Sequence, residues 1–313
     1  MSDDRRLDDA ARAGWLYYVA RRTQDEIARE LGVSRQKAQR LVAQAAQAGL
    51  VKVRLEHPIA RCMELAARLR ERYGLQVSHV APSDPAAPEL LDGIASAAAV
   101  EMERILLDEE PRIVALGTGR ALTAAVEQVQ RMDRPQHRIV SLLGNMMMDG
   151  SATRFSATVR LAERTGARHY PMALPVFARD EGEVEMLRAQ PPVASTLELC
   201  AEADVVFVGI APVSEHAPMV VDGFVEIEEA REMVRQGAVG EITGWAYDAE
   251  GRILEGGHNT RVTGAPIRPA PSRPTVAVGH GRGKVRAIRA ALAGRLVNGV
   301  ITDEATADAL LAD

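Results

Sequence analysis

The segment that decides the fold runs from residue 113 to residue 120 and reads Ile113-Val114-Ala115-Leu116-Gly117-Thr118-Gly119-Arg120. Four consecutive apolar residues without polar alternation are typical of a strand that is buried on both faces, as in a parallel sheet. The glycine-containing turn that follows leads into residues 121–129, which are predicted to be helical. A strand, a short turn and a helix in this order are the repeating unit of an α/β fold.

The same alternation of strands and helices continues on both sides of this segment. Further strands are predicted at residues 77–80, 139–143, 204–209, 275–278 and 299–301. Further helices are predicted at residues 58–73, 90–107, 153–164, 285–293 and 303–311. Residues 58–313 are therefore predicted to form one Rossmann-like α/β domain, with a mostly parallel sheet and helices on both of its faces.

Three of the predicted strands end in glycine and polar residues. The first end is Gly117-Thr118-Gly119-Arg120, the second is Gly144-Asn145, and the third is Gly279-His280-Gly281-Arg282-Gly283-Lys284. Ligands of parallel sheets bind beyond the carboxyl ends of the strands, and a helix N-terminus favours negative charge. Each glycine pair alone is equally consistent with a tight turn, but three such ends together favour a site for an anionic or polyhydroxylated small molecule.

The first 57 residues differ from the rest in charge. Residues 1–54 contain 11 Lys and Arg against 7 Asp and Glu, a formal charge of +4, whereas the remaining residues contain 27 against 36, a formal charge of −9. Within this basic part, Thr23 and Glu26 have the spacing of a capping box, Gly32 suits a helix C-terminus, and Ser34 suits a helix N-cap. Two short helices joined by a tight turn predict a helix-turn-helix domain at residues 1–57.

The second of these helices, over residues 34–48, has two distinct faces. Its predicted inner stripe consists of Ala38, Leu41, Val42 and Ala45. The candidate DNA-binding residues on its outer side and at its start are Ser34, Arg35, Gln36, Lys37, Gln39 and Arg40. Amide and guanidinium groups pair with base edges, whereas lysine and helix N-terminal amides suit phosphates. Residues 51–55 are expected to form a short strand or wing, and the alternative to DNA binding is a solvated face on an ordinary three-helix unit.

Several classes of protein are excluded by composition. No run of about 18 apolar residues exists, so no transmembrane helix is expected, and the charged N-terminus does not precede the apolar segment of a signal peptide. We therefore expect a cytoplasmic protein. Cys62 and Cys200 are too few for a disulfide framework or a four-ligand zinc site, and the seven histidines lack metal-ligand spacing. We expect neither a metal nor a cofactor.

Longer stretches of the chain resemble a known family. Residues 23–35 and 50–53 are similar to the N-terminal domain of the SorC family of bacterial transcriptional regulators, also called DeoR-like or sugar-binding regulators. The stretches that resemble its effector domain are residues 115–120, 140–145, 206–210, 237–244, Asp248, 283–284 and 298–307. The resemblance covers nearly the whole chain. It implies that the helix beginning at Ser34 enters the major groove of DNA.

The resemblance also implies the nature of the larger domain. It would be similar to ribose-5-phosphate isomerase and glucosamine-6-phosphate deaminase, bind a sugar, a polyol or a sugar phosphate, and assemble into a homo-oligomer, usually a tetramer. By position, the loop at residues 117–120 and Lys284 would face the phosphate or hydroxyl groups, and Glu241 would line the same pocket. The full candidate effector-binding set is Gly117, Thr118, Gly119, Arg120, Gly144, Asn145, Glu241, Trp245, Gly281, Gly283 and Lys284.

Two residues depart from the family pattern. Ala121 stands where many members have threonine, and Trp245 stands where many have arginine. Both changes remove groups that could hold a phosphate, and an aromatic wall at Trp245 would suit the apolar face of a carbohydrate. These departures favour an unphosphorylated sugar or polyol, and the runs at residues 117–122 and 240–245 look most like the branch that regulates erythritol and related polyol catabolism.

The sequence therefore predicts a DNA-binding regulator of a carbohydrate or polyol operon, without catalytic residues. Its partners would be double-stranded operator DNA, the small-molecule effector and further copies of the same chain. The alternative is a sugar-phosphate isomerase or deaminase-like enzyme with an added DNA-binding head. Asp149, Glu181, Glu241 and His280 are candidate bases by residue type alone, and Lys284 is a conceivable Schiff-base amine. No stretch matches the catalytic pattern of such an enzyme.

Overall fold

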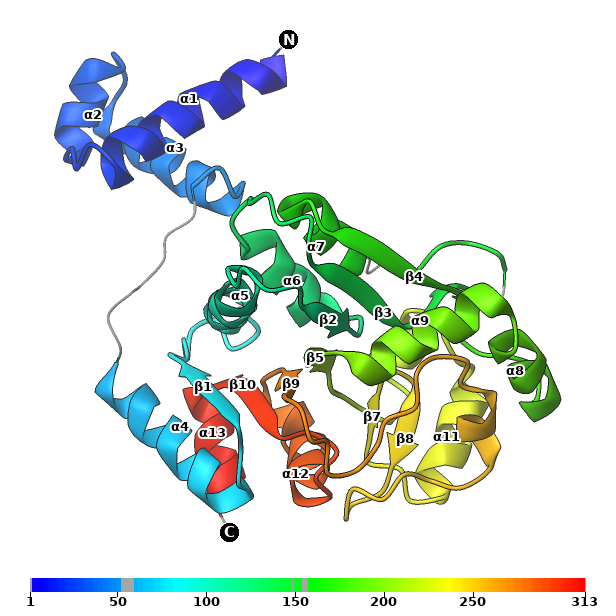
Figure 1. Ribbon diagram of the computed structural model, residues 1–313. Helices are drawn as coiled ribbons and strands as arrows, with labels where there is room; N and C mark the ends of the chain where they lie inside the picture. The colour runs from blue at the N-terminus through cyan, green and yellow to red at the C-terminus, as the bar shows by residue number, and fades with distance from the viewer. Residues whose placement is uncertain (1, 52–58, 148, 154–156, 313) are drawn as a thin grey trace. The chain divides into compact units, whose positions relative to one another are not determined.

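The chain divides into two compact units, Met1–His57 and Pro58–Asp313 (Figure 1). The computed structural model describes residues 2–51, 59–147, 149–153 and 157–312. The expected wing, apart from Val51, and the predicted boundary at residues 57 and 58 lie outside the described residues. Among the described residues, no helix is both long enough and apolar enough to cross a membrane.

The described residues of the N-terminal unit, 2–51, form three helices, α1 (Ser2–Tyr18), α2 (Gln24–Glu30) and α3 (Arg35–Gln47). Each helix contributes one apolar face to a common core, which is formed by Ala10, Ala13, Leu16, Ile27, Ala28, Ala38, Leu41, Val42 and Ala45. The predicted inner stripe of α3 is thus confirmed. Helices α1 and α3 approach closely at Gly14, because a Cβ there would lie 2.8 Å from the Cβ of Ala45.

Local hydrogen bonds define where the helices of this unit begin. The backbone N–H of Thr23 donates to Glu26 Oε2 at 2.8 Å, and the N–H of Glu26 donates to Thr23 Oγ1 at 3.4 Å, which completes the predicted capping box. The N–H of Lys37 donates to Ser34 Oγ at 3.2 Å. Between α2 and α3, Gly32 has a φ of +63°, a conformation that glycine adopts without a steric penalty.

Replacing Thr23 with alanine is expected to destabilise the N-terminal unit by about 1 kcal/mol, because an N-cap side chain that accepts an orphan N–H contributes about that much. The measurement is urea unfolding followed by Trp15 fluorescence in a Trp245→Phe background. Thr23→Ser retains the hydroxyl and is the matched control. An equal loss of stability in Thr23→Ala and Thr23→Ser would mean that the capping hydroxyl does not contribute to the stability of the unit.

The C-terminal unit is organised around a parallel sheet of seven strands in the order β1-β10-β9-β5-β2-β3-β4. Their bounds are β1 (Val77–Ala81), β2 (Ile113–Leu116), β3 (Arg138–Met146), β4 (Arg168–Pro175), β5 (Val205–Gly209), β9 (Thr275–Val278) and β10 (Gly299–Asp303). A small antiparallel sheet contains β6 (Ala211–Pro212), β7 (Gly240–Ile242) and β8 (Trp245–Tyr247). The mixed α/β architecture with a mainly parallel sheet confirms the predicted fold class.

Helices cover both faces of the parallel sheet (Figure 1). One face packs against α4 (Ala60–Tyr73), α9 (Pro191–Glu202), α12 (Val285–Ala293) and α13 (Glu304–Leu311). The other packs against α5 (Asp92–Leu106), α6 (Arg120–Gln128) and α7 (Ala157–Thr165). The remaining helical elements are α8 (Glu181–Arg188), α10 (Pro218–Val221), α11 (Ile227–Arg235), η1 (Gly257–Arg261) and η2 (Arg282–Lys284).

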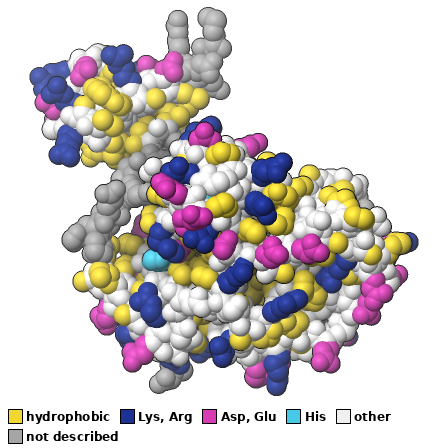
Figure 2. Space-filling view, in the orientation of Figure 1, with side chains coloured by type: hydrophobic (Ala, Val, Ile, Leu, Met, Phe, Trp, Pro, Cys, Tyr) yellow, Lys and Arg dark blue, Asp and Glu magenta, His cyan; other side chains and the backbone are white. Residues whose placement is uncertain are grey.

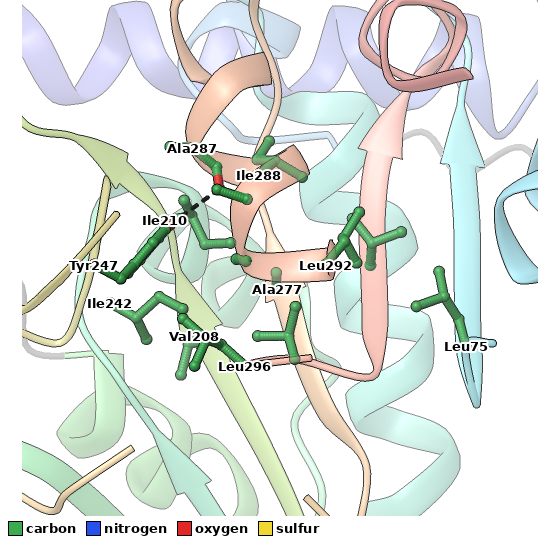
Figure 3. Packing of buried hydrophobic residues seen from close by; sticks show 14 of the residues in the cluster. Leu75, Val208, Ile210, Ile242, Tyr247, Ala277, Ala287, Ile288, Leu292 and Leu296 are labelled. Atoms are coloured by element: carbon green, nitrogen blue, oxygen red, sulfur yellow. Dashed lines mark hydrogen bonds between the residues drawn. The ribbon is translucent and has the colours of Figure 1, made fainter. Parts of the chain in front are cut away.

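The small sheet is joined to the main core by Tyr247, which is fully buried. Its hydroxyl donates a hydrogen bond to the backbone oxygen of Ala287 at 3.1 Å, and Figure 3 shows this bond beside the apolar side chains of Ile210 and Ile242. Because a buried tyrosine needs a partner for its hydroxyl, this contact fixes the β7–β8 hairpin against α12. The hairpin therefore has a defined position beside the loop that precedes α12.

Candidate functional site

The topology creates a crevice at the carboxyl ends of β2, β5 and β9. These strands are neighbours in the sheet, but the helix that follows β2 and the helix that follows β9 cover opposite faces, since α6 belongs to one core and α12 to the other. The two connecting loops therefore diverge. Crevices at such switch points are where open α/β sheets bind ligands.

A cavity of about 340 Å³ lies at this crevice, within the size range of small-molecule sites. Its polar wall comes from three loops that are distant in sequence: Thr118, Gly119 and Arg120 after β2, Glu241, Thr243 and Gly244 on the β7–β8 hairpin, and Gly279, His280 and Lys284 after β9. Its apolar wall includes Leu91, Leu143, Val176, Phe177, Ile210, Met219 and Phe224. The arrangement is that of a small polar ligand held against an apolar surface.

Lys284 and Glu241 are the partly buried ionisable pair of this cavity. Burial lowers the pKa of the Lys284 ammonium, and the attraction of Glu241 opposes this shift. Burial likewise raises the pKa of Glu241, although its Oε2 accepts a hydrogen bond from the N–H of Gly244 at 2.8 Å. Burial thus favours the neutral form of each group, whereas the attraction between the two groups favours their charged forms. Both groups can exchange hydrogen bonds with hydroxyl groups.

Arg120 begins α6 at the edge of the cavity. Its guanidinium lies 3.6 Å from the carboxylate of Asp222, whose side chain is only 10% exposed. The preceding Gly119 has a φ of +127° and provides no side-chain cap. N–H groups at a helix N-terminus bind hydroxyl or anionic oxygens of a ligand, and Gly119 adds no side chain that would compete for those of α6.

His280 lines the cavity next to Asp303. Its Nδ1 lies 3.5 Å from Asp303 Oδ2, and Asp303 also accepts from the Ser83 hydroxyl at 2.8 Å and from the N–H of Thr306 at 2.9 Å. Burial acts to raise the pKa of Asp303, but the bonds with His280, Thr306 and Ser83 outweigh it and hold this pKa well below its usual range. Asp303 is therefore a charged anchor rather than a proton donor.

Five of the candidate effector-binding residues line this cavity: Thr118, Gly119, Arg120, Glu241 and Lys284. Gly117, Gly144 and Asn145 instead line a separate cavity of about 60 Å³ that shares Thr118 and Leu143 with the larger one. Gly281 and Gly283 shape the turn before α12 without lining the cavity. The sequence interpretation missed Phe177, Met219, Asp222 and Phe224, because no glycine-rich motif marks the segments that contain them.

Gly144 has a packing role that its sequence pattern did not reveal. A Cβ at this position would lie 2.3 Å from the backbone oxygen of Pro175 and 2.5 Å from that of Leu174. Strand β3 is therefore able to pair with β4 only because residue 144 has no side chain. Glycine at residue 144 therefore has a packing reason that is independent of any ligand contact.

Gly144→Ala is accordingly expected to destabilise the C-terminal unit by roughly 1–3 kcal/mol, the usual cost of overpacking. The measurement is thermal or urea unfolding of the full chain. Gly283→Ala is the control, because nothing lies within 4 Å of a Cβ built there. Equal stability of the two variants would show that the strand pair relaxes without cost.

The structure corrects the expectation for Trp245. This residue is paired with Ile242 in the hairpin, whereas Glu241 is paired with Ala246, and successive residues of a strand face opposite sides. The indole Nε1 donates to the backbone oxygen of Ala265 at 2.9 Å, and the ring lines a groove beside Arg188 of α8. Trp245 is therefore not a wall of the main cavity, whose aromatic wall comes from Phe177 and Phe224.

The candidate DNA-binding residues share one exposed surface of the N-terminal unit. Ser34, Arg35, Gln36, Lys37, Gln39 and Arg40 are all exposed, and the buried residues of α3 lie on its opposite side. Figure 2 shows basic side chains gathered on this unit. Arg35 also lies 3.5 Å from the carboxylate of Asp25 in α2, and that contact orients its side chain at the start of α3.

A three-helix unit with an exposed polar helix, joined to an α/β unit with a ligand-sized cavity, defines the class of ligand-controlled DNA-binding regulators. Comparisons with known proteins agree with this class. Residues 57–312 match the Sugar-bind family of sugar-binding domains. The erythritol catabolism regulatory protein EryD of Brucella abortus is 36% identical over 302 residues, which are 96% of each chain.

Two further relatives extend this agreement. The transcriptional regulator LsrR of Klebsiella pneumoniae is 30% identical over 307 residues, covering 96% of this chain and 92% of that protein. The crystal structure of the full-length sorbitol operon regulator SorC from Klebsiella pneumoniae superposes with a TM-score of 0.72 at 24% identity, covering 99% of this chain and 100% of that chain. The chain belongs to the SorC family of sugar-binding transcriptional regulators.

Proposed function

We propose that the chain regulates a carbohydrate or polyol catabolic operon from the cytoplasm, with α3 bound to operator DNA and a small effector bound in the main cavity. The observation that carries this proposal is the convergence of Arg120, Glu241 and Lys284 from three loops at the carboxyl ends of the sheet. The erythritol catabolism named for EryD supports a polyol as the effector class.

The charges of the cavity favour a neutral effector over a phosphorylated one. Its lining contains three carboxylates, Glu89, Asp222 and Glu241, against two basic side chains, Arg120 and Lys284. Because Arg120 already faces Asp222, its charge is partly compensated before a ligand arrives. A neutral polyol can accept a hydrogen bond from Lys284 and donate one to Glu241. A phosphate group would add roughly two negative charges to a cavity that already contains three carboxylates.

The same cavity is proposed to be a binding site and not a catalytic centre. The relatives are named as transcriptional regulators, and Asp303 is proposed to anchor His280 rather than to act as an acid or base. The alternative, an isomerase or deaminase, requires a base placed at the reacting sugar carbon. Steady product formation from ribose 5-phosphate or glucosamine 6-phosphate would support that alternative.

We further propose that the protein acts as a homo-oligomer, with a tetramer as the expected state. A dimer is the minimum that places two recognition helices on a palindromic site. On α1, the apolar side chains of Leu7, Trp15 and Tyr18 are 40%, 55% and 37% exposed, and a second copy of the chain could cover them. Sedimentation of the full chain tests this assembly, and a monomer at micromolar concentration would contradict it.

The test of the effector proposal is a thermal-shift series with the full chain. The compounds are erythritol, other four- to six-carbon polyols, neutral sugars, and the phosphates of the same molecules. A ligand at about 100 times its Kd stabilises the folded state by about 2.7 kcal/mol, so a binding polyol is expected to raise Tm clearly. Stabilisation by phosphorylated compounds alone would overturn the neutral-effector proposal and make Lys284 and the start of α6 a phosphate site.

A further inference from the structure

We propose that His258, which lies outside the cavity, is a positioning residue that holds the effector-binding carboxylate of Glu241 through the backbone of Gly244. The proposal rests on the proposed function, because it assigns to His258 the control of a group in the effector site. Affinity for the effector is then highest when the His258 ring holds the Gly244 carbonyl in place.

His258 lies in η1, is 6% exposed, and contacts two oxygen atoms. Its Nδ1 lies 2.7 Å from Glu229 Oε1 of α11, and its Nε2 lies 2.9 Å from the backbone oxygen of Gly244. On its face the ring packs against Phe177, with a centroid distance of 4.7 Å. The imidazole is thus held between α11 and the β7–β8 hairpin by a polar contact on each side.

Both oxygen atoms accept hydrogen bonds only. A backbone carbonyl has no proton to donate, and a neutral imidazole has one N–H and one bare nitrogen. Glu229 is held as a carboxylate: burial acts to raise its pKa, but the contacts with His258 and Arg261 outweigh burial and lower it. Only the doubly protonated ring therefore makes both bonds, and loss of either proton leaves a nitrogen lone pair facing an oxygen.

Gly244 transmits this contact to the effector site. Its carbonyl oxygen accepts from His258, and its N–H donates to Glu241 Oε2 at 2.8 Å. The turn between these bonds is conformationally costly at Thr243, which has a φ of +50°, whereas Gly244 adopts its φ of +89° without a steric penalty. A turn of this kind persists only where surrounding contacts hold it, so releasing His258 frees the peptide that orients Glu241.

The charged groups around the ring come from each element packed against it. Among the described residues, Glu229 faces it from α11, Arg261 lies beside Glu229 at 2.8 Å in η1, and Glu241 follows through the turn. Arg261 shares Glu229 Oε1 with His258 and competes for the same carboxylate. Glu229 Oε1 therefore contacts both side chains, and the second nitrogen of the ring reaches the Gly244 oxygen.

The first measurement is independent of any effector. It compares the hydrogen-exchange rate of the Gly244 amide in the full chain, in His258→Leu and in His258→Gln. We expect exchange at least about tenfold faster in His258→Leu and a smaller change in His258→Gln, whose amide N–H can still donate to the Gly244 oxygen. His216→Gln, at an exposed histidine, is the control. Unchanged exchange in both His258 variants would overturn the proposal.

The second measurement is the Kd for the polyol that gives the largest thermal shift. We expect this Kd to rise about tenfold in His258→Leu and less in His258→Gln, whose amide N–H can still donate to the Gly244 oxygen. An unchanged Kd in His258→Leu would overturn the proposal. If no polyol binds the unsubstituted chain, the effector proposal fails, and the exchange rates alone decide the role of His258.

Discussion

Lys284→Ala is expected to weaken effector binding by about 10- to 100-fold while leaving operator binding in the absence of effector unchanged. Hydrogen bonds to a charged group contribute about 1.5–3 kcal/mol each, and a factor of ten corresponds to about 1.4 kcal/mol. We expect an effect of this size because Lys284 lines the cavity close to Glu241. The measurement is isothermal titration of the full chain with the stabilising polyol.

Arg286→Ala is the matched control for this substitution. This substitution also removes a positive charge. Arg286 lies two residues after Lys284, in α12, and is exposed without lining the cavity. The effector affinity of Arg286→Ala should remain within about twofold of the unsubstituted chain. Equal weakening in both variants would mean that only the net charge of the unit matters and that Lys284 makes no direct contact.

Gln36→Ala and Arg40→Ala are each expected to cost roughly 1–3 kcal/mol of operator binding and to relax sequence preference. Both side chains extend from α3 on the side opposite its buried stripe, where a helix that enters the major groove meets base edges. The measurement uses DNA selected by the purified full chain from a random-sequence pool, compared with a scrambled fragment.

Lys37→Ala separates base contacts from phosphate contacts. Replacing a residue that contacts phosphate is expected to weaken binding to selected and scrambled DNA equally. It is also expected to reduce the dependence of affinity on salt concentration. If Gln36→Ala and Arg40→Ala show the same behaviour as Lys37→Ala, their side chains contact the backbone and base reading lies elsewhere on α3. If none of the three changes affinity, α3 is not the DNA-binding helix.

The parts of the fold that were predictable are those where local chemistry decides the structure. The buried strands at residues 113–116 and 275–278 and the helix at residues 285–293 have the predicted bounds, because their apolar runs and flanking glycines are unambiguous. Strand β4 was not predicted. It contains Pro171, which interior strands exclude, and it is tolerated because β4 forms the edge of the sheet.

The candidate site was predictable only where loops carry their own signal. Thr118, Gly119, Arg120 and Lys284 belong to glycine-rich turns whose position at strand ends follows from the fold. Trp245, by contrast, was predicted to line the cavity but lies on the other face of its strand. Neighbouring residues of a short strand face opposite sides, and no local signal marks which side meets the cavity. The contact between His258 and Gly244 spans 14 residues and depends on tertiary packing, so the sequence contains no local pattern for it.

In the proposed function, one chain couples effector binding to DNA binding. A ligand shifts such an equilibrium only through its different affinity for the two states, and the coupling is reciprocal. The most direct measurement is the Kd of the full chain for its selected operator fragment with and without saturating polyol, together with the Kd for the polyol with and without that DNA. We expect both affinities to change by the same factor, about fivefold or more. We expect this change to be absent in Lys284→Ala. A polyol that binds in the cavity and leaves the operator affinity unchanged would contradict the proposed function.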